Sequence, residues 1–494
     1  MDWLWTAGAL LLVPVSLFLY IRLNDRRLTR IPEAALSFSP TRSTPDDIRL
    51  TGARLLESPI SILDQLPPKT GRRYIVVGGA GFLGGWIVIG LLQRGEDPKQ
   101  IRVVDLRLPV RRDLSTGQAK DIQFIQADVS DAVAVEAAFS APWPDDVPTS
   151  SAITVFHTAA NIRFYEHSRS ILPNSAKVNV TGTQNVIDAA RSIGATALIY
   201  TSSGSVTVRS TRFLLWPWEK EPKYFVQVVN DDAAIIPKRH EDFFSNYAVT
   251  KIDAERRVCA ADKTASRQGI LRTGCIRPGN GIFGPGGDML CGAYLVRKVN
   301  PSWIDYSVQN FIYVENAAVA HLLYEQRLIE LSEGSKNPDI GGQAFAVADP
   351  GPPPTYGDVY LALSTLTDGE ATFPFVSPTL MLFVAHVIEW YYLARASLVS
   401  AGYRLAEKLP VLGSDVVNLQ PSLFNLVNVH LIFDDSRARL PPEKGGLGYK
   451  GAWTTLEAVH KTVDEHKLGQ LRSEQRSDAA GISVGFGLVK AQRG

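Results

Sequence analysis

The chain has 494 residues, with 51 basic against 50 acidic side chains, a hydrophobic fraction of 45% and three cysteines. This length suits two or three domains, or one large α/β unit with additions. The balanced charge argues against a protein that binds nucleic-acid backbones, and the hydrophobic fraction excludes a disordered chain. Cys259, Cys275 and Cys291 form no CxxC pair, so neither a disulfide framework nor a zinc site is expected.

The first segment of the chain is strongly apolar. Residues 3–21 carry no charge, which approaches the roughly 20 residues that a helix needs to cross a bilayer. Arginines follow this run, whereas a cleaved secretory signal has basic residues before its apolar run and a small-residue cleavage site after it. We therefore expect residues 1–22 to form a retained transmembrane anchor, with the rest of the chain cytosolic by the positive-inside rule. Residues 23–70, rich in Ser, Thr and Pro, indicate a tether with at most a short helix.

A dinucleotide-binding turn is predicted directly after the tether. The β-branched run at residues 73–77 leads into Gly78, Gly81 and Gly84, and then into a helix-length apolar segment. Glycine permits the tight turn, the close approach of a pyrophosphate and the packing of the helix on the strand. The N-terminus of the helix then offers free N–H groups to the phosphates.

The next strand indicates which dinucleotide is bound. Residues 101–104 end in Asp105, about 20 residues after the last glycine, where a carboxylate binds the adenosine ribose. An acid at this place favours NAD, because it would repel the 2′-phosphate of NADP. Arg107, Arg111 and Arg112 follow closely and leave NADP as an alternative.

Strand-like runs continue to alternate with helical stretches. The runs at residues 122–125, 153–156 and 197–200 each end in polar residues. This alternation predicts an α/β fold with a Rossmann-like, doubly wound parallel sheet. Ligands of such sheets bind at the carboxyl ends of the strands, where these polar residues fall.

A catalytic pair is predicted on one later helix. Tyr247 and Lys251 are four residues apart and therefore share a helix face. A phenol normally titrates near 10, but a neighbouring ammonium and a nicotinamide cation favour its phenolate, which can then accept the proton of an alcohol that loses hydride. Ser203, at the end of a strand, is suitably placed to bind the same oxygen.

These motifs resemble an extended short-chain dehydrogenase/reductase. They comprise the three glycines, Asp105, Asp128-Val129, His157-Thr158-Ala159-Ala160, Tyr200-Thr201-Ser202-Ser203 and Tyr247-x-x-x-Lys251. More narrowly, the chain resembles the family of 3β-hydroxysteroid dehydrogenases and sterol-4α-carboxylate 3-dehydrogenases over residues 72–465. The later motifs that carry this resemblance are Arg277-Pro278 with the turn at 284–286, and the segments 311–321, 342–345 and 433–449.

The resemblance implies roles for individual residues. Tyr247 would be the general base, Lys251 would lower its pKa and hold the nicotinamide ribose, and Ser203 would orient the substrate oxygen, with Ser202 as a substitute. The implied cofactor-binding residues are Gly78, Gly81, Phe82, Leu83, Gly84, Asp105, Asp128, Val129, Ala159, Tyr247, Lys251 and Pro278. No metal is expected.

Two further segments have open interpretations. The long stretch between Ser203 and Tyr247 carries several aromatic residues, so it is either a lid over an apolar substrate or a packed insertion. Residues 378–393 are apolar and begin after Ser377, a plausible N-cap, so they form either a helix that lies against a membrane or a buried helix of the substrate lobe. The expected domains are the anchor at 1–22, the tether at 23–70, an NAD-binding Rossmann domain at 71–280, a smaller C-terminal α/β substrate lobe at 281–470 and a flexible tail at 471–494.

The function implied by this reading is the NAD-dependent oxidation of the 3β-hydroxyl of a sterol or triterpenoid, with decarboxylation where the substrate carries a 4α-carboxylate. The alternatives are a 3β-hydroxysteroid dehydrogenase/isomerase, a reductase of another lipophilic alcohol or ketone, a nucleotide-sugar epimerase and a non-catalytic dinucleotide sensor. The expected partners are a lipophilic substrate, a membrane (of the endoplasmic reticulum) and, as one oligomeric option, a second copy in a homodimer, with no nucleic acid.

Overall fold

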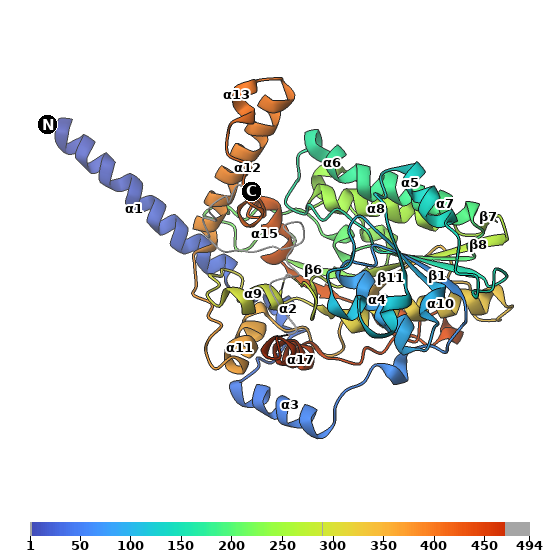
Figure 1. The fold of residues 1–494 in the computed structure, drawn as a ribbon. Coiled ribbons are helices and arrows are strands. Elements are labelled where there is room, and N and C mark those ends of the chain that lie inside the picture. Colours follow the sequence, from blue (N-terminus) through green and yellow to red (C-terminus); the bar gives the residue numbers. More distant parts are fainter. Residues whose placement is uncertain (1, 289, 470–494) are drawn as a thin grey trace.

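The computed structural model describes residues 2–288 and 290–469, and its centre is one large sheet (Figure 1). Seven strands run parallel in the order β3-β2-β1-β4-β5-β8-β11, and the short β7 pairs antiparallel with β8. The strands are β1 (Arg73–Val77), β2 (Ile101–Asp105), β3 (Gln123–Gln126), β4 (Ile153–His157), β5 (Ala197–Thr201), β7 (Thr264–Ser266), β8 (Gly269–Pro278) and β11 (Ala344–Val347). The strand order reverses between β1 and β4, which is where ligands of doubly wound sheets bind. The predicted Rossmann-like sheet is confirmed.

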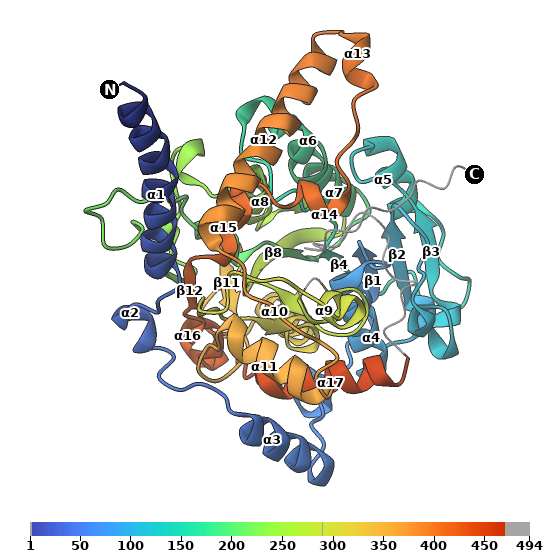
Figure 2. The ribbon, with the colours of Figure 1, turned by 90° about the vertical axis from the view of Figure 1, so that its left-hand side faces the viewer.

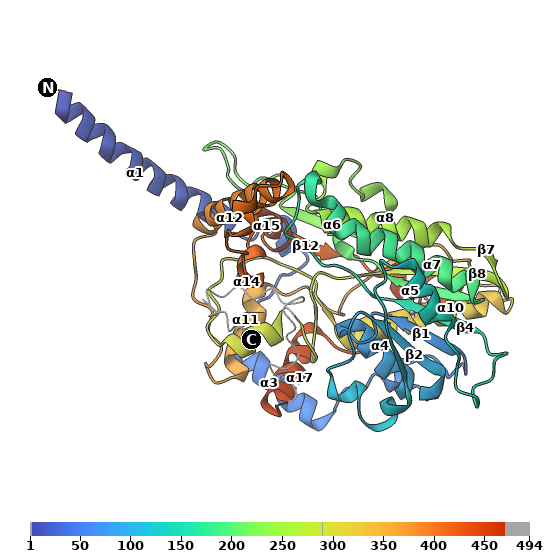
Figure 3. The same cartoon turned by 45° about the horizontal axis from the view of Figure 1, so that its top comes forward.

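Helices cover both faces of this sheet (Figure 3). On one face lie α5 (Ala132–Ser140), α7 (Thr183–Ser192) and α8 (Asn246–Ala260), and on the other lie α4 (Phe82–Gln93) and α10 (Val314–Ser332). Because both faces are covered, every residue of the central strands β1, β4 and β5 is buried. This explains why these strands are continuous apolar runs rather than alternating ones.

The remaining elements form a smaller lobe that is interleaved with the sheet domain. Its strands are β6 (Val226–Val229) paired with β12 (His430–Phe433), and β9 (Ile282–Phe283) paired with β10 (Ile312–Tyr313). Further α-helices after β4 are α6 (Leu172–Ala176), α9 (Cys291–Arg297), α11 (Tyr356–Leu366), α12 (Pro378–Ser400), α13 (Arg404–Glu407), α14 (Ser414–Val417), α15 (Pro421–Val427), α16 (Ser436–Arg439) and α17 (Thr455–Lys467). The stretch between Ser203 and Tyr247 thus supplies β6 to this lobe. Beyond the expected boundary at 280, β11 is a strand of the large sheet and α10 packs on that sheet.

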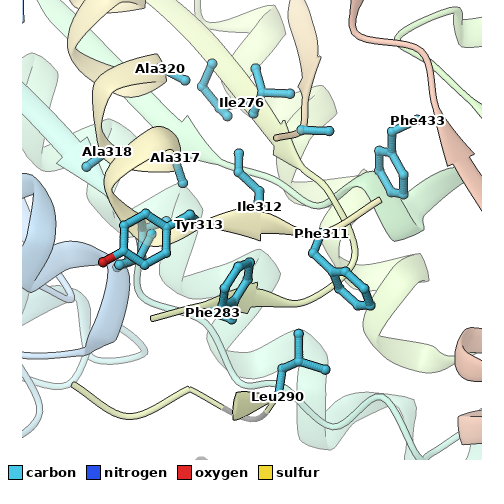
Figure 4. Close-up of a cluster of buried hydrophobic side chains, with 14 of the residues drawn as sticks. Ile276, Phe283, Leu290, Phe311, Ile312, Tyr313, Ala317, Ala318, Ala320 and Phe433 are labelled. Atoms are coloured by element: carbon cyan, nitrogen blue, oxygen red, sulfur yellow. The ribbon is translucent and has the colours of Figure 1, made fainter. Parts of the chain in front are cut away.

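An aromatic cluster joins the lobe to the sheet domain (Figure 4). Phe283, Phe311 and Tyr313 are fully buried, and the ring of Phe283 lies 6.4 Å from that of Phe311 and 5.6 Å from that of Tyr313. These side chains come from β9, β10 and the loop before β10, directly ahead of α10. The two parts of the chain therefore share one core.

The predicted transmembrane anchor at residues 1–22 is wrong. Among the described residues, the structure contains no helix that is long and apolar enough to span a bilayer. The first helix, α1 (Asp2–Leu28), runs past the expected end, and its last turns carry Arg22, Asp25, Arg26 and Arg27. Asn24 in these turns is buried and donates hydrogen bonds to the carbonyl of Phe213 (3.0 Å) and to Thr379 Oγ1 (2.9 Å). The helix end is thus part of the folded body, and the predicted single-pass location in the endoplasmic reticulum is not supported.

The segment predicted as a tether contains two helices, α2 (Glu33–Leu36) and α3 (Pro45–Glu57). Thr44 and Asp47 form a capping box at the start of α3. Ile48 is fully buried, and its carbonyl lies 2.8 Å from Nε2 of His460 on α17. Figure 2 shows α3 lying beneath α11 and α17. A 13-residue docked helix therefore stands where the sequence indicated a tether with at most a short helix.

The second apolar segment begins as predicted, because the side chain of Ser377 accepts a hydrogen bond from the N–H of Leu380 at the start of α12. Pro378, Thr379, Leu382 and Ala385 of this helix are buried, and the C-terminal part of α12 projects from the body together with α13 (Figures 1 and 2). Contact of residues 378–393 with a membrane stays a prediction. The predicted flexible tail at 471–494 lies outside the described residues.

Candidate active site

The glycine turn after β1 has no room for side chains. Gly78 has a φ of +82°, and an added Cβ would lie 2.6 Å from both the amide nitrogen of Ala159 and Thr158 Oγ1. A Cβ at Gly84 would overlap the carbonyl oxygen of Gly78. Gly81 precedes Phe82, the first residue of α4, and no side chain caps the first N–H groups of the helix. These groups stay available for an anion, as binding of a pyrophosphate requires.

Asp105 lies beside this turn. Its Oδ2 accepts a hydrogen bond from the N–H of Ala80 (3.1 Å) and its Oδ1 one from the N–H of Arg107 (3.3 Å). Burial raises the pKa of its carboxyl group. Arg111 lies against the first turn of α4, where its guanidinium donates to Asp113 and to the carbonyl of Phe82. Arg111, one of the three arginines that kept NADP as an alternative cofactor, therefore already has hydrogen-bond partners within the protein.

The expected adenine-binding residues lie at the end of β3. Asp128 Oδ1 accepts a hydrogen bond from the N–H of Ser130 (2.8 Å), and this bond lowers the pKa of the Asp128 carboxyl. The carbonyl of Val129 accepts one from Asn185 Nδ2 (2.9 Å). On the other side of the turn, the N–H of Ala159 donates to the carbonyl of Val77 (3.2 Å). Their contact with a cofactor stays a prediction.

Ser203 lies two residues after the end of β5, and Tyr247 and Lys251 lie in the first half of α8. Ser245 caps α8 by accepting a hydrogen bond from the N–H of Ala248 (3.3 Å), which places Tyr247 in the first turn. Burial raises the pKa of Tyr247 to about 12, against the opposing effect of its hydrogen bond with Ser203. The two serines proposed to orient the substrate oxygen both have partners in this structure. The Ser202 hydroxyl donates to Glu255 Oε2 (2.6 Å), and Ser203 Oγ lies 2.7 Å from Ser205 Oγ.

Lys251 is almost fully buried. Its Nζ donates to the carbonyl of Thr201 (2.5 Å) and lies 4.2 Å from the centre of the Tyr200 ring. Burial lowers the pKa of Lys251 to about 7, while the carboxylate of Glu255 acts in the opposite direction. The resemblance implies that Lys251 lowers the pKa of Tyr247. In this structure the pKa of Tyr247 is set by burial and by Ser203, without a contribution from Lys251. The catalytic roles of the three residues stay predictions.

A buried ion pair near these residues was not predicted, because no local sequence pattern indicates it. Arg277, at the end of β8, donates to both carboxylate oxygens of Glu255 (2.9 and 2.6 Å), and all of these groups are buried. Glu255 follows Lys251 by one helical turn, and Ser202 binds the same carboxylate. The pair therefore connects β5, β8 and α8 directly below Ser203. Pro278, an expected cofactor residue, follows Arg277 and is buried.

His321 of α10 supports the same strand end. Its Nδ1 lies 2.7 Å from the carbonyl of Ala317 and its Nε2 lies 2.7 Å from Thr201 Oγ1. A carbonyl can only accept, so Nδ1 carries the proton and Nε2 accepts from the threonine hydroxyl. Burial lowers the pKa of His321 to about 4, which keeps the ring neutral. The imidazole of His321 thus holds the side chain of Thr201, and the carbonyl of Thr201 binds Lys251.

The fold and the site together define a Rossmann-fold oxidoreductase that acts on CH–OH groups. The sequence profile of the 3-beta hydroxysteroid dehydrogenase/isomerase family matches residues 75–372, and the chain belongs to this family. Membership confirms the predicted resemblance and the NAD-dependent oxidoreductase class.

The chain is similar to several relatives whose names state an activity. The 3beta-hydroxysteroid-dehydrogenase/decarboxylase isoform 1 of Arabidopsis thaliana is 28% identical over 427 residues, 83% of each chain. Isoform 2 is 29% identical over 413 residues, which are 80% of this chain but only 62% of that relative. The decarboxylating sterol-4-alpha-carboxylate 3-dehydrogenase of Candida albicans is 30% identical over 289 residues, 56% of this chain and 70% of that protein.

Solved structures show the same fold at low sequence identity. An epimerase from Methanothermobacter thermautotrophicus has a TM-score of 0.52 at 16% identity, covering 83% of this chain and 98% of that one. UDP-glucose 4-epimerase from Thermotoga maritima has a TM-score of 0.50 at 18% identity, covering 80% and 99%. These likenesses establish the architecture alone.

Proposed function

We propose that the protein oxidises the 3β-hydroxyl of a sterol-like substrate that bears a 4α-carboxylate, with NAD as the hydride acceptor, and that carbon dioxide is then lost. The observation that supports this proposal is that Lys251, one helical turn after Tyr247 on α8, binds the carbonyl of Thr201 at the end of β5, two residues before Ser203. The substrate class is supported by the names of the relatives, two of which are 3beta-hydroxysteroid-dehydrogenase/decarboxylases and one a sterol-4-alpha-carboxylate 3-dehydrogenase.

The residues around the glycine turn fit a bound dinucleotide. Gly78 and Gly84 leave no room for a Cβ in the turn, and among the described residues no side chain caps the N-terminus of α4, so its first N–H groups are free to bind a pyrophosphate. Asp105 would hold the adenosine ribose and Lys251 the nicotinamide ribose. When bound, NAD supplies the acceptor for the hydride that leaves carbon 3.

Tyr247 is the proton acceptor in this proposal. As the C–H bond at carbon 3 breaks, the phenolate oxygen of Tyr247 takes the proton of the substrate hydroxyl. Ser203 donates a hydrogen bond to the same substrate oxygen and thereby orients it. A protonated Lys251 favours the phenolate, because a nearby positive charge stabilises the ionised form. Its carbonyl partner, Thr201, keeps the ammonium at the end of β5.

Loss of carbon dioxide follows from the product of oxidation. The 3-ketone and the carboxylate at carbon 4 form a β-keto acid, so the bond from carbon 4 to the carboxyl carbon breaks and its electron pair moves toward the ketone oxygen. The resulting enolate oxygen lies against the Tyr247 hydroxyl, which has just gained a proton and can return it. One tyrosine thus serves both steps.

The test compares wild-type protein with Tyr247→Phe, and with Tyr306→Phe as a matched control at an exposed tyrosine. Each is incubated with NAD and a 3β-hydroxysterol, either with or without a 4α-carboxylate. NADH is followed by absorbance and carbon dioxide by a labelled carboxyl carbon. We expect both products from the acid with wild type and Tyr306→Phe, and a loss of at least about 100-fold with Tyr247→Phe, in line with the contribution of a general base.

Two results would overturn the proposal. Conversion of nucleotide sugars without oxidation of any sterol would assign the site to a different substrate class. Oxidation of sterols that retain the carboxylate, or that shift a ring double bond instead, would refute decarboxylation.

A further inference from the structure

The projecting helix α12 is hydrogen-bonded to a buried carboxylate near the active site. The hydroxyl of Tyr392 donates to Glu166 Oε1 (2.6 Å) and accepts from Arg163 Nη2 (2.8 Å). Arg163 also donates to Glu166 Oε1 through Nε (2.9 Å) and Nη2 (2.7 Å). The ring of Tyr165 meets that of Tyr392 edge-on at 6.1 Å. Tyr392 is 226 residues from Glu166 and 229 from Arg163 in the sequence, so its two hydrogen bonds are long-range tertiary contacts.

The loop that carries Glu166 also holds the first residue of the catalytic helix. The N–H of Asn246 donates to the backbone carbonyl of Glu166 (2.7 Å), and Asn246 Nδ2 donates to the carbonyl of Ser168 (2.8 Å). Asn246 directly precedes Tyr247. One residue, Glu166, therefore binds α12 through its side chain and the start of α8 through its backbone.

Tyr392 supplies one of the three hydrogen bonds to the carboxylate of Glu166, and Arg163 supplies the other two. The side chain of Glu166 is fully buried, and three hydrogen bonds converge on Oε1, whereas Oε2 has no partner among the described residues. A buried carboxylate that loses one of few donors moves to recover solvation, because an unsatisfied charged group is costly. Such a movement would shift the backbone carbonyl that binds Asn246.

Tyr392 also borders a cavity of about 140 Å³ between α12 and α6. The cavity is lined by Ile171, Asn174, Tyr391, Tyr392, Arg395 and Leu412, among others. A chain of hydrogen bonds connects the wall of this cavity to α8. Asn161 Nδ2 donates to the carbonyl of Asn174 in the wall (3.2 Å), and Asn179 Nδ2 donates both to the carbonyl of Asn161 (3.0 Å) and to Thr250 Oγ1 in α8 (3.0 Å). Tyr392 thus stands between this cavity and the loop of Glu166.

We propose that Tyr392 is a positioning residue for catalysis: through Glu166 it fixes Asn246, and with it the first turn of α8 that carries the Tyr247 hydroxyl. Its kinetic consequence rests on the proposed function, whereas its structural consequence does not. The helix that projects from the substrate lobe is therefore part of the support of the general base.

The adjacent tyrosines of α12 provide a matched pair of variants. Tyr392→Phe removes the hydroxyl that binds Glu166 and leaves the ring against Tyr165. Tyr391→Phe removes a hydroxyl that donates to the carbonyl of Pro410 (2.8 Å) and makes no hydrogen bond with Glu166. Glu166→Gln, a third variant, keeps the shape of the side chain and removes its charge.

The first readout is hydrogen–deuterium exchange of the free protein, which needs no substrate. We expect Tyr392→Phe and Glu166→Gln to raise exchange in peptides that contain Asn246 and Ala248 by about tenfold, the loss expected for one hydrogen bond to a charged group. Tyr391→Phe should exchange as wild type does. Unchanged exchange in Tyr392→Phe, or an increase spread evenly over the whole chain, overturns the proposal.

The second readout is the kinetics of sterol oxidation. We expect kcat of Tyr392→Phe to fall about tenfold while KM for NAD stays unchanged, and the acidic limb of the kcat profile to move to higher pH, since a displaced Tyr247 loses the hydrogen bond from Ser203 that lowers its pKa. A rise in KM for NAD with an unchanged pH profile refutes a positioning role. If no variant and no wild-type protein turns over a sterol, the proposed function fails, and the exchange result still decides on Tyr392.

Discussion

A methyl group added at Gly84 tests the dinucleotide-binding turn most directly. It would overlap the carbonyl oxygen of Gly78 and lie 2.7 Å from both the carbonyl carbon of Gly78 and Thr158 Oγ1. Non-bonded carbon contacts are normally about 3.5 Å or longer, so the turn has to move by roughly 1 Å. Overpacking of this kind costs about 1–3 kcal/mol, and replacing a helical glycine returns about 0.5–1 kcal/mol. We expect Gly84→Ala to lower the free energy of unfolding by about 1–2 kcal/mol.

The larger effect should be on the cofactor. A displacement of about 1 Å in a positioned site costs on the order of 100-fold, so NAD should bind Gly84→Ala about 100-fold more weakly. Urea unfolding and a titration of tryptophan fluorescence with NAD measure the two quantities. The control is Gly90→Ala in the same helix, where the added methyl meets only the end of the Leu322 side chain at 3.1 Å, which can turn aside. A folded Gly84→Ala protein that binds NAD as wild type does would refute the assignment of this turn.

Two further substitutions test neighbouring parts of the site. Asp105→Ser removes the carboxylate that would repel a 2′-phosphate, so the ratio of kcat/KM for NAD to that for NADP should fall about tenfold or more, and an unchanged ratio would contradict the role of Asp105. Glu255→Gln leaves the buried guanidinium of Arg277 without its counter-charge, so urea unfolding should show a loss of about 3–5 kcal/mol. A loss below about 1 kcal/mol would mean that Arg277 is satisfied in another way.

The parts of the site that local sequence could predict are those formed by short segments. Gly78 to Gly84 form a turn within one strand–helix unit, and Tyr247 and Lys251 share one helix, so spacing alone indicates their arrangement. The support of Lys251 is different. Glu255 binds Arg277 across 22 residues of sequence separation, and His321 reaches Thr201 from a helix 120 residues later. Such contacts depend on the order of the strands in the sheet, which no local pattern contains.

The N-terminal prediction was wrong for a related reason, since a local pattern does not show long-range contacts. An uncharged run at residues 3–21 predicts a membrane span when it is judged by hydropathy alone. The structure continues this helix through Arg22 and Asp25 to Leu28 and buries Asn24 against Thr379, 355 positions away. The local apolar signal could not reveal that the polar end of the helix has partners in α12 and in the insertion after β5. Tertiary hydrogen bonds hold the C-terminal end of this helix to the folded body.

The buried ammonium of Lys251 has a role in the proposed catalysis but lowers the free energy of unfolding at neutral pH. Its pKa in the folded protein is about 7, against 10.5 for an unperturbed lysine, so between these values the unfolded chain binds a proton that the folded one lacks. The contribution of this residue to the free energy of unfolding therefore rises with pH across that range, and its penalty is complete below about pH 7. We expect Lys251→Met to unfold at higher urea than wild type at pH 7, with an advantage that shrinks toward pH 10, a value close to the unperturbed pKa of lysine.

Lys69→Met, at an exposed position, should leave the pH dependence unchanged and serves as the control. The same Lys251→Met protein should lose sterol oxidation, because the phenolate of Tyr247 would no longer have a positive neighbour. A parallel stability curve for wild type and Lys251→Met would show that the ammonium is not desolvated in the fold. A variant that is more stable at neutral pH and inactive would instead show that the buried ammonium opposes folding and is needed for proton transfer, as is common for groups placed in active sites.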